Sequence, residues 1–267
     1  MPASRGCTTP RSPGANTLLH VRDLTISYGG EPVLERASLA VGEGSFVSLV
    51  GPSGSGKSSL LRAVIGLQQP LSGTVETTLT PAEIGLLFQD DALLPWKTAR
   101  DNVVLGLTLN GMERGKALAE ADTWLERLGL AGFGDRFPRH LSGGQRKRVA
   151  LAQVLARRPK LILMDEPFAS LDAIVRSRVI RDVVALVEQS GISVLLVTHD
   201  LEEALTLSDD VYLLSQGPRA RITQHYHVPI PRPRDPVLSR TDPAFAPLYE
   251  RLWADLSRAV DHRAEAA

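Results

Sequence analysis

Short apolar runs separated by helical patterns dominate the middle of the chain. Residues 161–165 (LILMD) and 192–199 (ISVLLVTH) are nearly continuous apolar runs, and a further strand-like run occupies residues 45–50. Runs of this length between helices are typical of parallel strands that are buried on both faces. Residues 18–28 instead alternate apolar and polar side chains, which predicts another strand.

Helical periodicity fills most of the sequence around these strands. It occurs in residues 57–67 (KSSLLRAVIGL), in residues 173–189, and in most of residues 101–158, where several glycines interrupt it. This order of elements predicts an α/β fold with a parallel sheet and a helical insertion near residues 92–158.

The composition of the sequence changes after Gly217. Residues 229–236 (PIPRPRDP) are rich in proline and arginine, which predicts extended polypeptide crossing a surface. Apolar side chains then recur at the spacing of an amphipathic helix, at Phe245, Leu248, Leu252, Leu256 and Val260. Such a helix either packs back on the domain, which we favour, or binds a partner. We therefore treat residues 218–267 as a C-terminal extension.

Composition and charge narrow the classes of protein. The chain has 267 residues, of which 43% are hydrophobic, so it can bury a sizeable core. Its 30 basic and 30 acidic residues cancel, so bulk charge gives no indication of nucleic acid binding. Cys7 is the only cysteine, which excludes a disulfide framework and fits a reducing cytoplasm.

The sequence also bears on targeting and membrane insertion. No apolar run approaches the roughly 20 residues of a transmembrane helix. Residues 1–17 contain arginines and prolines without an apolar segment, so we expect a disordered leader and not a secretory signal. Work at a membrane would therefore require a partner.

The chemistry begins with residues 51–58 (GPSGSGKS), which follow a predicted strand and precede a predicted helix. This context identifies a phosphate-binding loop. Its glycines allow backbone N–H groups to point at phosphate oxygens, and the helix adds its positive end. Lys57 would reach the β- and γ-phosphates, and Ser58 would bind Mg²⁺. The residues expected around ATP here are Gly51, Pro52, Ser53, Gly54, Ser55, Gly56, Lys57, Ser58 and Ser59.

Two carboxylates follow the apolar strand 161–165. Asp165 ends the strand, where it would lie beside the phosphate loop and bind Mg²⁺. Glu166 comes next and is placed to orient a water molecule against the γ-phosphate as a general base. After a phosphate loop, this pair favours catalysis over a solvated turn.

A third motif, residues 141–145 (LSGGQ), precedes another helical pattern. Taken alone, it predicts only a helix cap. Together with the other two motifs, it makes the chain resemble the ATP-binding cassette (ABC) ATPases, whose signature sequence matches Leu141, Ser142, Gly143, Gly144 and Gln145. The resemblance runs from about Leu18 to about Gly217. It implies a P-loop NTPase (RecA-like) core with a small antiparallel β subdomain and the helical subdomain.

The resemblance also implies roles for individual residues. Tyr28 matches the aromatic residue that stacks on adenine, with a place in the core as the alternative. Gln89 matches the glutamine that touches Mg²⁺ and the attacking water, and His199 matches the histidine that contacts the γ-phosphate. Residues Ser170, Leu171 and Asp172 match the loop that crosses to a second subunit.

In this family the signature residues bind ATP held by the other copy, so the resemblance implies a homodimer that closes on two ATP molecules. Hydrolysis would follow in-line attack of water, helped by Lys57, Mg²⁺, His199 and the opposing Ser142. Two departures stand out. The segment between Gly73 and Gln89 is shorter than in related importers, which puts the small antiparallel hairpin in doubt. Lys147 stands where a glutamine is commoner.

Three classes of ABC protein compete: a transport motor, a soluble ATPase of DNA repair, and a regulatory factor. The short insertion without cysteines and the single cassette favour a motor detached from its permease. It would lie on the cytoplasmic face of the bacterial inner membrane, served indirectly by a periplasmic solute-binding protein. LLPW after Gln89, DEPFASLDA and the PRPRD segment resemble importers of nitrate, sulfonates including taurine, and thiamine pyrimidine precursors.

The loop 88–102 (FQDDALLPWKTARDN) places apolar residues beside a helix-breaking proline. In this family, the start of the helical insertion forms the groove that receives a short helix of the permease. Leu94 and Trp96 would then contact the permease, with Asp90, Asp91, Lys97 and Arg100 around them. Internal packing of both side chains is the alternative.

Overall fold

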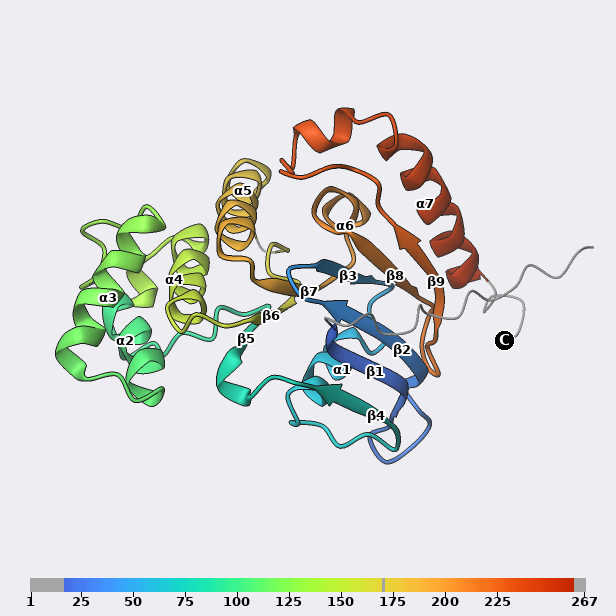
Figure 1. Cartoon of the computed structure of the whole chain (residues 1–267), viewed down its shortest axis with the longest axis horizontal. Helices are drawn as coiled ribbons and strands as arrows, with labels where there is room; N and C mark the ends of the chain where they lie inside the picture. Colours follow the sequence, from blue (N-terminus) through green and yellow to red (C-terminus); the bar gives the residue numbers. More distant parts are fainter. Residues whose placement is uncertain (1–16, 170, 262–267) are drawn as a thin grey trace, which may run out of the picture.

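The predicted buried strands lie side by side in one sheet (Figure 1). The computed structural model describes residues 17–169 and 171–261, and the order of this sheet is β5-β6-β7-β3-β8-β9. Neighbouring strands are parallel except at β9, which pairs with β8 antiparallel. The bounds are β3 Phe46–Val50, β5 Ile84–Leu87, β6 Leu161–Asp165, β7 Ser193–Thr198, β8 Asp210–Leu214 and β9 Ile222–His227.

Side chains of this sheet contribute to hydrophobic clusters on both of its faces. In β6, Leu161 and Leu163 pack with helix α1 (Lys57–Val64), whereas Ile162 and Met164 pack with helices of the other face. The split follows the strand period, because successive side chains point to opposite faces. Burial on both faces explains why these strands are apolar throughout.

A second, antiparallel sheet packs over α1 in the order β2-β1-β4. Its strands are β1 Thr17–Ile26, β2 Leu34–Gly42 and β4 Ser72–Thr77. The sequence put a small antiparallel hairpin between Gly73 and Gln89 in doubt, and in the described structure this segment contributes only β4 to the antiparallel sheet, where it pairs with β1, while β5 belongs to the parallel sheet. The first strand begins at Thr17, one residue inside the range expected for the leader, and residues 1–16 lie outside the described residues.

The helical insertion projects to one side of the core in Figure 1. It consists of α2 Ala99–Leu109, α3 Arg114–Arg127 and α4 Gly143–Leu155, and α5 Ala173–Ser190 lies between it and the sheet. Buried side chains such as Val103, Trp124 and Val149 join these helices to the same cluster as one face of β6. The insertion therefore has no separate core.

The C-terminal extension is built into the fold. Its first part is β9, and its last helix α7 (Phe245–Asp261) packs against α6 (Leu201–Leu207) and β8. Phe245 and Leu252 are buried in that contact and Leu248 and Leu256 are half-buried, while the side chain of Val260 lies outside the described residues. The packed arrangement is the one we favoured from the sequence.

The proline- and arginine-rich segment before α7 is held by a buried arginine. Arg234 donates hydrogen bonds to the carbonyl oxygens of Leu207 at 3.0 Å and Ile230 at 2.9 Å, and pairs with Asp209 at 3.0 Å.

Short 3₁₀ helices occupy Pro81–Glu83, Pro138–His140 and Leu238–Thr241. In the described part of the chain, no helix combines the length and apolarity needed to cross a bilayer.

Candidate active site

The loop between β3 and α1 holds three glycines at positions that require glycine. A Cβ atom on Gly51 would lie 2.8 Å from Cβ of Leu214. Gly54 and Gly56 have φ angles of +79° and +88°, which other residues adopt only with strain. The sequence pattern 51–58 therefore matches the backbone that it predicted.

The loop contains buried polar groups suited to an anion. Oγ of Ser55 is buried without a hydrogen-bond partner among the described residues, and a phosphate oxygen is the kind of acceptor that would satisfy it. Pro52 is half-buried and Ser53 is exposed at the mouth of the loop. The residues present thus fit a nucleotide phosphate chain.

Lys57 is buried at the first position of α1. Its Nζ atom donates hydrogen bonds of 2.8 Å to the carbonyl oxygens of both Gly51 and Pro52. Burial lowers the pKa of this ammonium group, and the carboxylates of Glu166 and Asp165 act in the opposite direction. The cation therefore lies inside the loop that the sequence assigned to phosphate.

Asp165 and Ser58 meet where β6 ends against α1. Oγ of Ser58 donates a hydrogen bond of 2.9 Å to Oδ1 of Asp165. Burial raises the pKa of the Asp165 carboxyl group, against the effect of the Ser58 hydrogen bond. A hydroxyl and a carboxylate oxygen so close together are ligands that fit Mg²⁺. Gln89 comes just after β5, whose Leu87 pairs with Met164 of the parallel strand β6. Gln89 and Asp165 therefore lie at the same carboxyl end of the parallel strands.

Glu166 lies between Lys57 and His199, two residues that the sequence assigned to the same site. Its Oε2 atom is 3.0 Å from Nδ1 of His199, and its Oε1 atom is 3.9 Å from Nζ of Lys57. The backbone of Glu166 has φ +42°, an uncommon value that turns its side chain at the strand end. The structure thus joins three predicted residues that are far apart in sequence.

Sequence reasoning missed the polar cluster that supports His199. Oγ1 of Thr198 donates to Glu203 at 2.9 Å and accepts from the backbone N–H of Asp200 at 3.0 Å. Burial raises the pKa of Glu203 to about 7. Nothing in the sequence indicated that Glu203 is buried, because glutamate is a residue type that usually lies at the surface.

Tyr28 lies at the edge of this site. Its hydroxyl donates a hydrogen bond of 2.9 Å to Oγ of Ser59, while 54% of the residue is exposed. Of the two alternatives, a tyrosine buried in the core is wrong. A solvent-facing ring beside α1 is compatible with stacking on a base.

The signature segment starts α4 and has a reciprocal cap. Oγ of Ser142 accepts from the N–H of Gln145 at 3.3 Å, and Oε1 of Gln145 accepts from the N–H of Ser142 at 2.9 Å. Leu141 is buried, and a Cβ on Gly144 would lie 2.5 Å from Val175 of α5. Among the described residues, no hydrogen bond or ion pair links this segment to the phosphate loop of its own chain.

The loop predicted to cross to a second subunit lies before α5. Ser170 lies outside the described residues. Leu171 is buried, and the side chain of Asp172 caps α5 by accepting from the N–H of Val175 at 3.0 Å.

The stretch after Gln89 has one buried anchor and one exposed aromatic. Asn102 is fully buried, and its side chain bonds to backbone groups of Leu94, Lys97 and Thr98. Leu94 is half-buried, whereas Trp96 is 71% exposed. Internal packing is therefore wrong for Trp96, and its exposure is compatible with the other alternative, contact with a permease.

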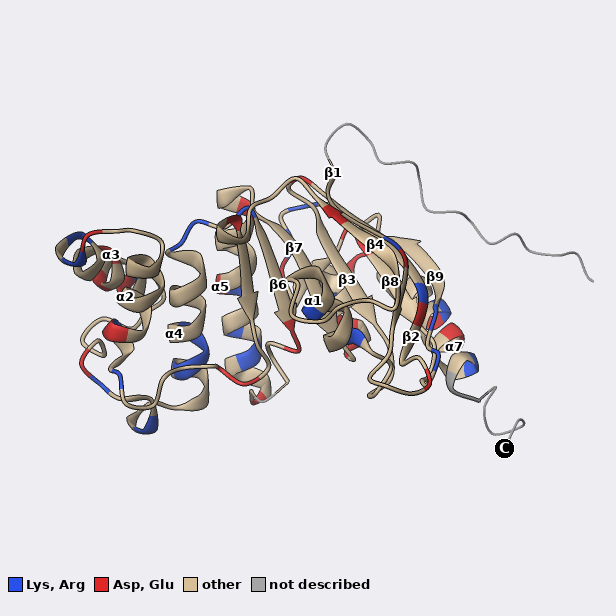
Figure 2. Ribbon diagram, turned by 90° about the horizontal axis from the view of Figure 1, so that it is seen from below, with Lys and Arg blue, Asp and Glu red and all other residues tan. Residues whose placement is uncertain are grey.

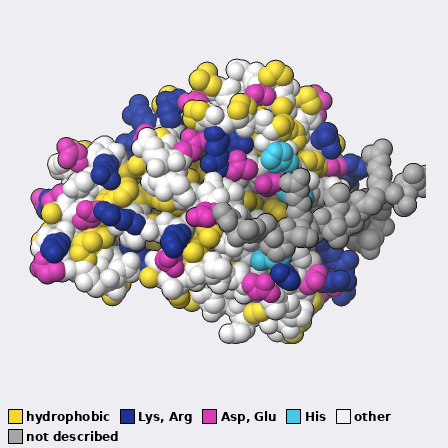
Figure 3. Space-filling model, viewed as in Figure 1, with side chains coloured by type: hydrophobic (Ala, Val, Ile, Leu, Met, Phe, Trp, Pro, Cys, Tyr) yellow, Lys and Arg dark blue, Asp and Glu magenta, His cyan; other side chains and the backbone are white. Residues whose placement is uncertain are grey.

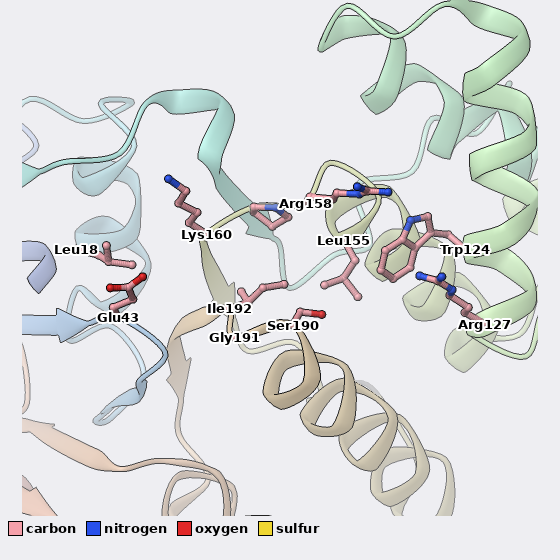
Figure 4. A pocket seen from close by; sticks show the side chains of 11 residues that line it. Leu18, Glu43, Trp124, Arg127, Leu155, Arg158, Lys160, Ser190, Gly191 and Ile192 are labelled. Atoms are coloured by element: carbon pink, nitrogen blue, oxygen red, sulfur yellow. The ribbon is translucent and has the colours of Figure 1, made fainter. Parts of the chain in front are cut away.

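A cavity of about 460 Å³ lies between α3 and the amino ends of the parallel strands (Figure 4). Its lining includes Glu43, Lys160 and Ile192, which precede β3, β6 and β7, together with Trp124 and Arg127 of α3. The predicted catalytic residues follow the other ends of these strands. This cavity is consequently separate from the candidate active site.

The comparisons with known proteins agree with this geometry. The model of the ABC transporter family matches residues 34–169. An aliphatic sulfonates import ATP-binding protein of Rhodococcus jostii is 44% identical over 81% of this chain and 85% of its own length. A protein of the same name from Rhizobium johnstonii is 43% identical over 91% of this chain and 92% of its own length.

Solved structures give the same result. A dimeric ATP-binding cassette in a post-hydrolysis state, bound to ADP and Pi, has a TM-score of 0.71 and 30% identity, covering 79% of this chain and 99% of that one. A second structure, part of an ABC transporter complex of Clostridium perfringens, has a TM-score of 0.71 and 27% identity, covering 79% and 89%. These similarities confirm the predicted fold, and the chain belongs to the ABC transporter family as an ATP-binding subunit that hydrolyses ATP.

Proposed function

We propose that this chain is the motor of an importer for aliphatic sulfonates or closely related small solutes. The observation that carries the proposal is the similarity over 81% and 91% of the chain to proteins named for aliphatic sulfonate import. The chain would bind a separate permease at the cytoplasmic face of the inner membrane, and a periplasmic binding protein would deliver the solute.

Each site residue has a proposed task. The amides of residues 51–58 and the Lys57 ammonium group would bind the phosphates of ATP, with Tyr28 against the adenine. Ser58, Gln89 and Asp165 would hold Mg²⁺, which supplies positive charge for the phosphates and the leaving group when it is bound.

Glu166 would accept a proton from the attacking water at a carboxylate oxygen. His199 lies against that carboxylate at 3.0 Å and would contact the γ-phosphate. Bond formation to the γ-phosphorus and cleavage of its bond to the bridging oxygen then release phosphate and ADP.

The separation of the signature segment from its own phosphate loop supports a dimer. Ser142 to Gln145 would complete the ATP site of a second copy in a head-to-tail pair, with residues 170–172 crossing between the copies.

The net charge of the chain is zero, and basic and acidic side chains are interspersed on the face shown in Figure 3. This balance gives no indication of nucleic acid binding.

Solute uptake by cells tests the proposed function. A strain that lacks this chain is expected to lose most uptake of a labelled short-chain alkanesulfonate. The wild-type chain should restore it and the Glu166→Gln variant should not, because uptake needs ATP turnover. If only the uptake of nitrate, taurine or a pyrimidine precursor were lost, that compound would replace the alkanesulfonate as the proposed solute. Unchanged uptake of all four would contradict the motor assignment.

In the same assay, Trp96→Ala is expected to lower uptake at least about 10-fold, because a large exposed aromatic contributes strongly to a docking contact. The ATPase activity of the purified variant should stay within about twofold of wild type. Trp253→Ala is the control, because Trp253 is also exposed but lies on α7. A Trp96→Ala protein that unfolds, or loses ATPase activity together with uptake, would contradict the docking role.

A further inference from the structure

Lys147, in the second turn of α4, is the buried cation with the most complete set of partners near the site. Its side chain is 1% exposed. The Nζ atom lies 3.2 Å from the carbonyl oxygen of Phe88, 3.0 Å from that of Gln89, and 3.1 Å from Oδ1 of Asp91. An ammonium group has three N–H donors, so each can be used here. Burying a charge is costly without such partners, which makes this contact specific.

The neighbouring residue of α4 strengthens the same contact. Nε of Arg146 lies 3.2 Å from Oδ2 of Asp91, and its Nη1 atom donates to the carbonyl oxygen of Leu141 at 3.0 Å. Asp91 is therefore bound by two consecutive residues of α4. Arg146 also ties this pair to the first residue of the signature segment. Basic residues colour the first turns of α4 in Figure 2.

The contact joins two parts of the chain that carry different proposed tasks. One is the connection from β5 to α2, which contains Gln89 and continues to the exposed Trp96. The other is α4, whose first turn is the signature segment. Ala92, directly after Asp91, has φ +52°, so the connection turns sharply at the point where it is held.

We propose that Lys147 is a positioning residue that fixes Gln89 relative to the signature helix. This inference rests on the proposed role of Gln89 at Mg²⁺ and the attacking water. Lys147 holds the backbone of Gln89 itself, so it limits where the amide side chain can reach beyond the end of β5. A shift of α4 then moves the Gln89 backbone with it, or breaks the three contacts of the ammonium group.

The consequence is a direct link between the two ATP sites of a dimer. The start of α4 would serve the ATP of the other copy, while Gln89 would serve the ATP of its own chain. Lys147 lies between them within one chain. Occupancy of one site is therefore expected to influence the geometry of Gln89 at the other.

Lys147→Met tests this proposal, because methionine keeps an unbranched apolar chain but removes the ammonium group. We expect kcat for ATP to fall about 10-fold or more, with the Kd of ATP within about twofold of wild type, since the lost contact orients Gln89 and does not touch the nucleotide. Lys147→Gln keeps a neutral donor and should recover part of kcat. Arg148→Met is the matched control, because it removes an ion pair to Asp182 of α5 from the next position of the same helix.

A double-mutant cycle with Gln89→Ala separates positioning from general stabilisation. If Lys147 acts through Gln89, adding Lys147→Met to Gln89→Ala should change kcat less than about twofold. Equal factors in both backgrounds would mean a structural role only and would overturn the proposal. Amide hydrogen exchange provides a second readout. Protection of residues 88–92 should fall in Lys147→Met and stay unchanged in Arg148→Met.

Failure of this inference is distinguishable from failure of the proposed function. Full activity of Gln89→Ala would remove the proposed role of Gln89, and the positioning role with it. A defective Gln89→Ala beside a fully active Lys147→Met would overturn the positioning role alone. If Lys147→Met does not fold, the same double-mutant cycle is measured with Lys147→Gln and tests the positioning role in the same way. The glutamine variant is expected to fold, because it retains a donor for the backbone carbonyl oxygens of Phe88 and Gln89.

Discussion

Glu166→Gln is expected to abolish ATP turnover while ATP binding is retained. The amide has the size of the carboxylate but cannot accept a proton from water, so kcat should fall about 100- to 10,000-fold, the usual contribution of a general base. The Kd of ATP should change little, because Glu166 has no part in holding the phosphates in the proposed site. Single-turnover hydrolysis and equilibrium binding of ATP measure the two quantities.

The same variant should accumulate as an ATP-bound dimer. Binding closes the proposed pair, and the absence of hydrolysis removes the step that opens it. Size-exclusion chromatography with ATP and Mg²⁺ follows this directly. Glu250→Gln, an exposed substitution on α7, is the control and should hydrolyse ATP at the wild-type rate. Unchanged hydrolysis by purified Glu166→Gln would show that another group accepts the proton.

Lys57→Met is expected to weaken ATP binding by about 100-fold, because charge-assisted hydrogen bonds to phosphate each contribute about 1.5–3 kcal/mol. The ammonium group already lies within the loop, held at 2.8 Å by the carbonyl oxygens of Gly51 and Pro52. It needs only to exchange these acceptors for phosphate oxygens. Isothermal titration with ATP and with a non-hydrolysable analogue measures the loss.

Folding of the Lys57→Met variant separates binding from stability. Lys57→Met leaves the carbonyl oxygens of Gly51 and Pro52 and the carboxylate of Glu166 without the ammonium group, so the melting temperature without nucleotide should fall. Thermal stabilisation by ATP should then disappear in Lys57→Met and persist in the exposed control Lys116→Met. Wild-type affinity for ATP in Lys57→Met would contradict the assignment of the loop.

Several features were accessible from the sequence because their chemistry is local. The phosphate loop needs glycines at fixed offsets from a strand and a helix, and all of these lie within residues 46–64. Asp165 and Glu166 end a strand whose apolar body is visible in the sequence. The capping box of Ser142 and Gln145 likewise depends on a spacing of three residues.

Other features depended on order in the sheet, which local patterns do not encode. The 3.0 Å contact of Glu166 with His199 exists because β6 and β7 are neighbours. Strand β9 was not predicted, because its residues are mostly polar and it pairs at the antiparallel edge. The exposure of Trp96 also could not be read from its hydrophobicity, since burial depends on what the rest of the chain covers.

By itself, the sequence determined the fold class, the phosphate-binding loop and the carboxylates beside it, since each follows from residues close together along the chain. The tertiary structure alone decided that Lys147 is buried against the carbonyl oxygen of Gln89, 58 residues away in sequence. It also decided that Tyr28 and Trp96 face solvent, and that no hydrogen bond or ion pair among the described residues links the signature segment to its own phosphate loop. The physical reason is that a buried charge is tolerated only where distant segments supply its partners, and that supply exists only in the folded chain.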